Sequence, residues 1–270
     1  MSRFQQPHSE PVAPILRDKH HDAPSAFKPE NLLREATRQK GLKPGPVPTV
    51  GVLDPDGDIV RQLKRSGSGT PDSNWACYHT ELWRVSDGGH ELGIVPCAVG
   101  ASFAVLVAEQ LFASGCKLLI SMSSAGRLSE LRPPPYFVLI EKALRDEGTS
   151  YHYAPPSEYS EADPALIQRL SSAFEASSPA VIRGPTWTTD APFRETSEAI
   201  AAMSARGLLA VEMEAAALYA FSRARGRPVV CFAHVTNQMA RIEGDFEKGE
   251  ADGTVEALQV IRGAAQALLP

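Results

Sequence analysis

Cysteines are scarce in the sequence, and none is spaced for metal binding or disulfide exchange. Cys77, Cys97, Cys116 and Cys231 are the four cysteines among 270 residues, and they form no CxxC pair. Three of them lie inside apolar runs, which is typical of buried free thiols in a reducing compartment. We therefore expect neither disulfides nor a metal centre, and no part of the sequence calls for a cofactor.

Long apolar runs and a strong charge of either sign are also missing. No run approaches the ~20 residues of a membrane span, and the polar, proline-rich N-terminus lacks the apolar core of a signal peptide. The net charge of -5 offers no electrostatic reason to bind nucleic acid or an anionic membrane. The sequence therefore predicts a cytoplasmic protein that acts on a small molecule.

Several common catalytic motifs are absent as well. The sequence contains no G-x-G-x-x-G, no P-loop, no H-E-x-x-H and no G-x-S-x-G. Dinucleotide binding, triphosphate binding, zinc proteolysis and serine hydrolysis therefore lack support.

What is present is an alternation of strands and helices after a proline-rich start. Residues 1–45 are expected to form an N-terminal extension with one helix between Pro29 and Gly41. Residues 46–270 are expected to form one domain, in which apolar runs alternate with helical segments of ~10 to 15 residues. This alternation predicts an α/β fold with a parallel or mixed central sheet flanked by helices.

The expected strands and helices can be placed by residue number. The strands are the apolar runs at 47–53, 91–99, 117–122, 136–144, 180–191, 208–213 and 227–237. The helices lie at 101–114, 164–174, 197–207, 214–226 and 254–269. Residues 64–73 have the composition of a flexible loop, residues 123–127, SSAGR, that of a tight turn, and the charged segment 243–253 that of a loop able to cover a site.

Candidate functional residues follow the apolar runs, because ligands of open α/β sheets bind at the carboxyl ends of the strands. These positions hold Ser121 to Arg127, Thr188 to Glu195, Glu212 to Glu214, and Thr236 to Gln238.

Glu212 and Glu214 flank Met213 at the expected junction between the strand 208–213 and the helix 214–226. One interpretation is structural, since carboxylates at a helix N-terminus stabilise it by ~0.3 to 1 kcal/mol each. The other is functional: two carboxylates accept hydrogen bonds from the vicinal hydroxyls of a ribose, and Met213 offers the sugar an apolar surface. Cleavage of a glycosidic bond builds positive charge on the sugar, which strengthens such hydrogen bonds. The segment alone leaves both interpretations open.

The segment 210–237, AVEMEAAALYAFSRARGRPVVCFAHVTN, resembles the signature region of the nucleoside phosphorylase superfamily. That superfamily holds uridine phosphorylase, hexameric purine nucleoside phosphorylase and the methylthioadenosine and AMP nucleosidases. Three further segments, GVLDPDGDIVRQL, ELGIVPCAVGASFAVLVAEQLFASGCKLLISMSSAGRL and GPTWTTDAPFRET, are similar to other parts of the family in order and spacing. The resemblance covers residues 47 to 265. It implies a three-layer fold with a mixed central sheet, and a dimer or a hexamer of dimers.

The resemblance also implies roles for individual residues in the sugar and base sites. Glu212, Met213 and Glu214 would bind the ribose, with Glu214 on its 2'-hydroxyl. Phe193 would stack on the base or sugar, because aromatic stacking suits any nucleobase. Arg194 and Glu195 would address the base edge.

Asn237 stands near the position where purine-cleaving relatives carry an aspartate that protonates the leaving base. An amide donates a hydrogen bond but delivers no proton, so the sequence favours a base with a carbonyl acceptor. Asp190 is the alternative acid, or it caps its turn.

The nucleophile site departs from the family pattern. Family glycine and arginine positions fall here at Leu53, Gly57 and Ser121, and another arginine position falls near Tyr78 or His79. The residues that would still hold an anion, through hydroxyls and backbone N–H groups, are Ser123, Ser124 and Gly126. The arginines that would compensate are Arg61, Arg65 and Arg127.

The predicted function is therefore a nucleoside phosphorylase that transfers ribose from a purine or pyrimidine ribonucleoside to phosphate. The alternatives are a nucleosidase that uses water, because phosphate-binding arginines are missing, and a non-catalytic nucleoside-binding protein.

Overall fold

The computed structural model describes residues 12–175, 179–237, 248 and 250–269. It contains a mixed sheet with the strand order β10-β6-β8-β9-β5-β1-β4-β3-β2, and β7 pairs with β6. The strands are β1 (Val50–Asp54), β2 (Thr70–Pro71), β3 (Trp83–Asp87), β4 (His90–Pro96), β5 (Leu118–Arg127), β6 (Tyr136–Asp146), β7 (Tyr159–Glu161), β8 (Val181–Thr189), β9 (Ala210–Glu212) and β10 (Val229–Asn237). Because β10 pairs with both β6 and β5, the strands β10, β6, β8, β9 and β5 close into a ring.

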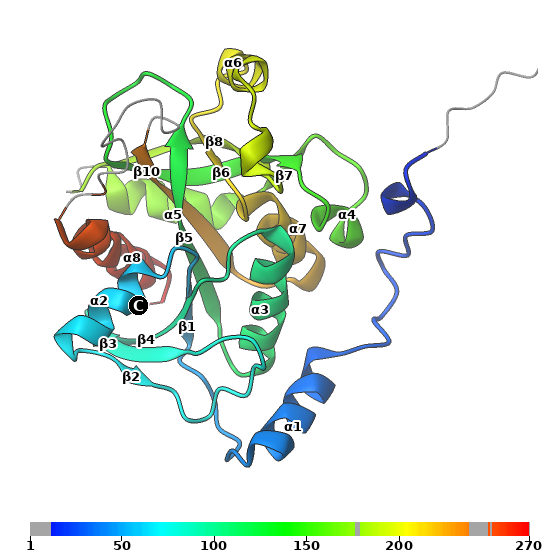
Figure 1. Ribbon diagram of the computed structural model, residues 1–270, viewed down its shortest axis with the longest axis vertical. Helices are drawn as coiled ribbons and strands as arrows, with labels where there is room; N and C mark the ends of the chain where they lie inside the picture. The colour runs from blue at the N-terminus through cyan, green and yellow to red at the C-terminus, as the bar shows by residue number, and fades with distance from the viewer. Residues whose placement is uncertain (1–11, 176–178, 238–247, 249, 270) are drawn as a thin grey trace, which may run out of the picture.

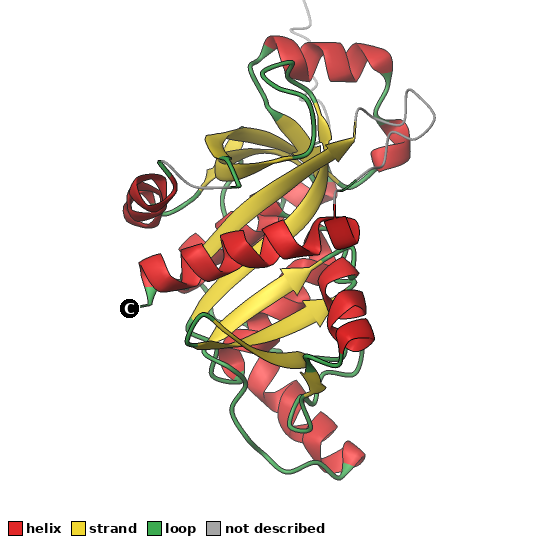
Figure 2. Ribbon diagram, turned by 90° about the vertical axis from the view of Figure 1, so that its left-hand side faces the viewer, coloured by secondary structure: helices red, strands yellow, loops and turns green. Residues whose placement is uncertain are grey.

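Helices cover both faces of this sheet. They are α1 (Pro29–Lys40), α2 (Asp58–Ser66), α3 (Ala101–Ala113), α4 (Ser150–Tyr153), α5 (Pro164–Phe174), α6 (Ser197–Ala205), α7 (Ala215–Arg225) and α8 (Thr254–Leu268). Helix α8 packs against α2 and α5, and α7 packs against α3 and α4. Figure 1 shows α2 and α8 to the left of β5 and β1, with α3 and α7 to the right. Figure 2 shows α8 lying across the strands. The expected three-layer α/β fold is confirmed.

The core follows from the sequence pattern of the central strands. Every residue of β1 and β10 is buried, as expected for strands covered by helices on both faces. Tyr219 of α7 crosses this core and is fully buried. Its hydroxyl donates to the carbonyl oxygen of Ile140 on β6 (2.6 Å) and accepts from the backbone N–H of Cys231 on β10 (3.0 Å). One side chain therefore links α7 to two strands of the ring.

Most predicted elements are present at nearly the expected residues. Helix α1 begins with Pro29 and ends at Gly41, whose positive φ of 64° suits glycine. Helix α5 begins after Asp163, whose carboxylate accepts from the N–H of Ala165 at 2.8 Å. The division between an extension and a domain at residue 45 stays a prediction, and residues 1–11 lie outside the described part of the chain.

Two segments predicted as loops are partly regular structure. The turn expected at 123–127 is wrong, because β5 continues to Arg127. Strand β10 pairs with β5 at Ser124 and β9 pairs with it at Gly126, so tertiary pairing overrides the turn composition. The loop expected at 64–73 holds the end of α2 and the short strand β2.

No helix among the described residues is both long and apolar enough to cross a membrane.

Replacing Tyr219 with Phe is expected to lower the free energy of unfolding by about 1 to 3 kcal/mol, because two buried backbone groups lose their partner. Urea denaturation measures the change. Tyr78→Phe is the matched control, since Tyr78 is exposed and its hydroxyl donates only to the side chain of Gln39. Equal destabilisation by both substitutions would contradict the linking role of Tyr219.

Candidate active site

Glu212 ends β9 and organises the junction between strand and helix. Its carboxylate accepts from the hydroxyls of Thr186 (3.2 Å) and Thr188 (2.5 Å) on β8. It also accepts from the backbone N–H groups of Glu214 (2.8 Å) and Ala215 (2.7 Å) at the start of α7. Burial raises its pKa, although these four hydrogen bonds oppose that shift. These four hydrogen bonds occupy the acceptor sites of the Glu212 carboxylate. This supports the structural interpretation of Glu212. Contact between Glu212 and a ribose stays a prediction.

Glu214 precedes α7 and is arranged differently. Its side chain is 1% exposed, and it accepts hydrogen bonds from the backbone N–H of Gly100 (2.7 Å) and the hydroxyl of Ser123 (2.6 Å). Each carboxylate oxygen keeps a further acceptor site. Burial, followed by the charge of Glu212, raises the pKa of Glu214 to about 7. The residue is therefore a buried carboxylate that is aimed by the protein and still able to accept from a ligand.

The neighbours of Glu214 include other residues that the sequence singled out. Met213 is half-buried beside it. The hydroxyl of Ser123 donates to Glu214. The next residue of β5, Ser124, pairs with His234 on β10 and lines a small cavity. Gly126 lies between Val211 of β9 and Asn237 of β10.

Asn237 is buried at the end of β10, 7% exposed. Its amide nitrogen donates to the hydroxyl of Thr236 at 3.2 Å, and its pairing with Gly126 places it on the strand that carries Ser123. The structure thus brings together the ends of β5, β9 and β10, as the sequence predicted. Gln238, which follows, lies outside the described residues.

The candidate base-site residues lie on a separate turn after β8. Asp190 is exposed, and its carboxylate accepts from the N–H of Gly148 at 2.8 Å. Phe193 and Arg194 lie in the short 3-10 helix Pro192–Arg194, with the Phe193 side chain 100% exposed. Glu195 follows, half-buried, and burial raises its pKa to about 7. Stacking by Phe193 and proton donation by Asp190 stay predictions.

Three positions where the family pattern was lost are buried in the structure. Leu53 is fully buried, and Ser121 is 1% exposed with no hydrogen-bond partner for its hydroxyl among the described residues. Gly57 has a positive φ of 74°, and a Cβ there would lie 2.8 Å from the sulfur of Cys97. None of these positions leaves room for a long cationic side chain.

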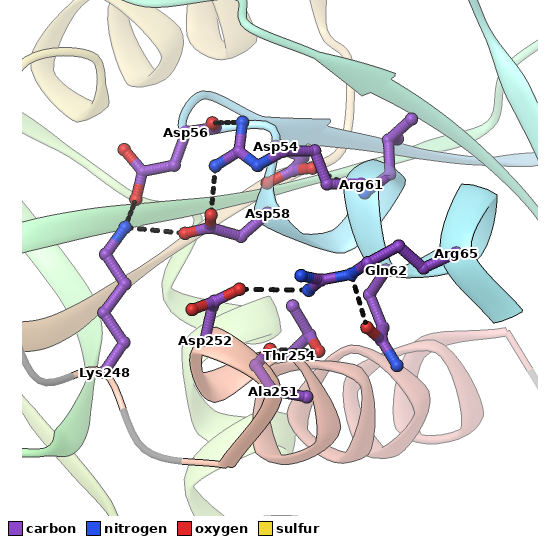
Figure 3. Close-up of polar contacts among 11 residues, drawn as sticks. Asp54, Asp56, Asp58, Arg61, Gln62, Arg65, Lys248, Ala251, Asp252 and Thr254 are labelled. Carbon is purple, nitrogen blue, oxygen red and sulfur yellow. Dashed lines mark hydrogen bonds and ion pairs between the residues drawn. The ribbon is translucent and has the colours of Figure 1, made fainter.

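Charged residues instead surround the turn after β1 (Figure 3). Lys248 donates to the carboxylates of Asp56 (2.7 Å) and Asp58 (2.6 Å), and Asp58 also pairs with Arg61. Arg65 pairs with Asp252 at 3.0 Å on the other side of the cluster. Arg61 and Arg65, two of the three arginines named from the sequence, are therefore already held by aspartates. The third, Arg127, lies at the end of β5, and its role as a compensating arginine stays a prediction.

Asp54, at the end of β1, is buried and accepts from the N–H of Val60 at 3.1 Å. Burial, assisted by the charges of Asp56 and Asp58, raises its pKa to about 7 despite that hydrogen bond. In the described part of the chain, no group of three or more His, Cys, Asp or Glu side chains is arranged to hold a metal ion.

Sequence reasoning missed several residues of this region. Gly100 contributes through its backbone N–H, which carries no side-chain signal. Lys248 lies within the segment 243–253 that was expected to cover a site, but its partners on the β1 turn are about 190 residues away in the sequence. Residues 243–247 and 249 lie outside the described residues.

A mixed α/β sheet with Glu212 and Glu214 at a strand-to-helix junction is the arrangement that the resemblance to nucleoside phosphorylases implied. A family model described as "Phosphorylase superfamily" matches residues 49–268. The chain belongs to the phosphorylase superfamily.

Two relatives are similar to this chain in sequence. The guanosine phosphorylase of Halorubrum lacusprofundi is 25% identical over 183 residues, which are 68% of this chain and 70% of that protein. The purine nucleoside phosphorylase DeoD-type of Myxococcus xanthus is 27% identical over 144 residues, 53% of this chain and 58% of that protein.

Solved structures of uridine phosphorylase from Vibrio fischeri show the same fold. The one complexed with 6-hydroxy-1-naphthoic acid has a TM-score of 0.67 and 21% identity, and the match covers 84% of this chain and 91% of that one. A second structure of the enzyme has a TM-score of 0.66 over 84% and 92% of the two chains.

Replacing Glu214 with Gln is expected to stabilise the fold at pH 8 by about 1 to 3 kcal/mol. The folded-state pKa of about 7 lies above that of an exposed glutamate, so the protonated group favours the fold at low pH and this contribution is lost as the pH rises through 7. The gain should be smaller at pH 5.5, by about 2 kcal/mol, and should vanish only below about pH 4.5, where the unfolded glutamate is also protonated. Urea denaturation at both pH values measures it.

Glu161→Gln, at an exposed position, is the control and should show no such gain at pH 8. If the free energy of unfolding changed equally with pH in the two variants, the assignment of a high pKa to Glu214 would be wrong.

Proposed function

We propose that this protein cleaves the N-ribosidic bond of a purine or pyrimidine ribonucleoside and transfers the ribose to phosphate. The observation that carries the proposal is the Glu214 carboxylate, buried, held by Gly100 and Ser123, and free to accept further hydrogen bonds. Phosphorolysis is supported by the names of the relatives, which are guanosine, purine nucleoside and uridine phosphorylases.

In the proposed reaction the C1'–N bond breaks and a bond from C1' to a phosphate oxygen forms. Positive charge develops on the ribose between these events, and ionised Glu214, bound to the 2'-hydroxyl, stabilises it. Met213 packs against the sugar. The base leaves with the bonding electrons, and Asn237 donates a hydrogen bond to its carbonyl, with Asp190 as the alternative proton donor.

The base-site turn has a part in this proposal. Phe193 stacks on the base, while Arg194 and Glu195 meet its edge. Full exposure of Phe193 fits a residue whose partner is the ligand or a second subunit. Assembly as a dimer or a hexamer of dimers in the cytoplasm belongs to the same proposal.

Hydrolysis is the second candidate, and one observation favours it. The cavity next to Ser124 has a volume of about 20 Å3, which suits one water molecule, and carboxylates of Asp54, Asp56 and Asp58 line it. Water as the nucleophile would release free ribose.

Glu214→Gln is expected to reduce kcat/KM for an identified nucleoside by about 100-fold or more, because a neutral amide stabilises a cationic transition state poorly. The wild-type kcat/KM should rise with pH through about 7, as Glu214 ionises. Steady-state rates and circular dichroism check activity and folding together, with Glu161→Gln as the control. Unchanged turnover in the Gln variant would remove Glu214 from the mechanism.

The nucleophile is tested with a panel of purine and pyrimidine ribonucleosides, with and without phosphate, followed by product analysis. We expect activity only with phosphate and ribose 1-phosphate as the product. Free ribose formed without phosphate would establish hydrolysis instead. Nucleoside binding without any cleavage would favour the non-catalytic alternative.

A further inference from the structure

The N-terminal segment, residues 12–28, lies against the body of the protein next to α4. Figure 1 shows it in dark blue, and its 3-10 helix Pro14–Leu16 contacts α4. All residues of the segment are exposed except Ile15, Lys19 and His21, which are half-buried. A terminal segment stays ordered only where it is tied to the rest of the fold, so these three residues are its anchors.

Two of the anchors are polar and bind α4. Lys19 donates from its Nζ atom to Nδ1 of His152 (3.0 Å), and His21 donates from Nε2 to the carbonyl oxygen of Tyr151 (3.2 Å). Helix α4 is a single turn, Ser150–Tyr153, and one helical turn is unstable without contacts from outside it. The N-terminal segment therefore supplies part of the support of α4.

The third anchor, Ile15, contacts a residue that is bonded to the base-site turn. A Cβ at Gly148 would lie 3.1 Å from Cδ1 of Ile15 and 3.7 Å from Oδ2 of Asp190, so the two side chains meet at this glycine. The N–H of Gly148 donates to the same Oδ2 atom at 2.8 Å. Ile15 thus packs on the donor residue of this hydrogen bond, and removing water from beside a hydrogen bond strengthens it.

Asp190 begins the base-site turn, residues 190–195. Its backbone N–H donates to the carbonyl oxygen of Asp146 at 3.3 Å, and within the turn the N–H of Arg194 donates to the carbonyl oxygen of Ala191 at 2.8 Å. Asp190 is therefore bonded through its backbone and through its side chain to the segment that follows β6. These two bonds fix where the turn starts.

We propose that Ile15 is a positioning residue for the nucleoside base, because it holds Gly148 against Asp190 and so fixes the turn 190–195. Lys19 and His21 contribute by keeping the N-terminal segment on α4. The inference rests on the proposed function, which assigns the base to this turn. It gives a role in substrate binding to a segment outside residues 49–268, the part of the chain that the family model matches.

Hydrogen–deuterium exchange of the full chain, followed by NMR without a nucleoside, tests the contact. In Ile15→Ala we expect the amides of Gly148, Asp190 and Arg194 to exchange about 5-fold faster than in the wild type, because the hydrogen bonds of the turn open more often. The amides of β1 and β10 should exchange as in the wild type.

Two further variants separate the contact from a general effect of substitution. Leu16→Ala is the matched control, because Leu16 is the next apolar residue of the same 3-10 helix and is exposed, and it should leave the turn unchanged. Ile15→Leu keeps an apolar side chain of the same size and should restore wild-type exchange.

Gly148→Ala tests the same contact from the other side. The φ angle of Gly148 is not in the left-handed region, so alanine fits the backbone, but its methyl group would displace Ile15. We expect faster exchange in the turn, as in Ile15→Ala. The double variant should exchange no faster than Ile15→Ala, because the added methyl group no longer meets the isoleucine side chain.

Steady-state kinetics with an identified nucleoside test the consequence for binding. Ile15→Ala is expected to raise KM by about 5-fold and to leave kcat within about 2-fold of the wild type, since the base is held less well in the ground state and the transition state alike. Leu16→Ala should change neither constant.

Wild-type exchange of the Gly148 and Asp190 amides in Ile15→Ala would overturn the inference, as would an equal effect of Leu16→Ala. Faster exchange throughout β1 and β10 would also overturn it, because Ile15 would then act on the whole fold. A lower kcat with an unchanged KM would contradict positioning of the base. Failure of the proposed function looks different: the exchange pattern of the variants is as expected, yet no nucleoside of the panel is cleaved.

Discussion

The carboxylate of Glu212 is the interaction on which the candidate site depends. It bonds at once to two threonines of β8 and to two backbone N–H groups at the start of α7, so it joins a strand of the ring to the helix that follows β9. A buried carboxylate costs free energy unless its acceptor sites are filled, and here the protein fills them. Because the helix start is held in this way, Glu214 projects toward Gly100 and Ser123 from a rigid position. Glu212 therefore stabilises the junction, whereas the carboxylate of Glu214 keeps acceptor sites for a ligand.

The charges at the end of β1 form the complementary part of the site. Asp56 and Asp58 pair with Lys248 and Arg61, and Asp252, which precedes α8, pairs with Arg65. Asp56 and Asp58 raise the pKa of Lys248, so its amine stays charged at the wall of a small cavity. Ser124 on β5 belongs to this cavity, whereas its neighbour Ser123 belongs to Glu214, because successive residues of a strand point to opposite faces. These adjacent serines therefore lie in two different surroundings.

Much of the fold could be predicted because its signals are local. The periodic apolar runs predict the strands, and residues such as Pro29, Gly41 and Asp163 mark helix ends through their own backbone and hydrogen-bonding chemistry. The end of β5 could not be predicted in this way. Its small residues favour a turn in isolation, and only pairing with β9 and β10 keeps them extended. The candidate ribose carboxylates were found from their position at a strand-to-helix junction, but which of the two is saturated depends on threonines 24 and 26 residues earlier in the chain.

The sequence by itself determined the class of fold, the order of its elements and the gathering of polar residues at strand ends, since these follow from periodicity and from residue types along the chain. Tertiary structure alone decided the state of each charged group. The pKa of Glu214 near 7, the neutrality of His234 and the pairing of Lys248 with Asp56 and Asp58 arise from burial and from partners distant in sequence. Desolvation and Coulomb interactions act through space, so a pattern of residues along the chain carries no measure of them.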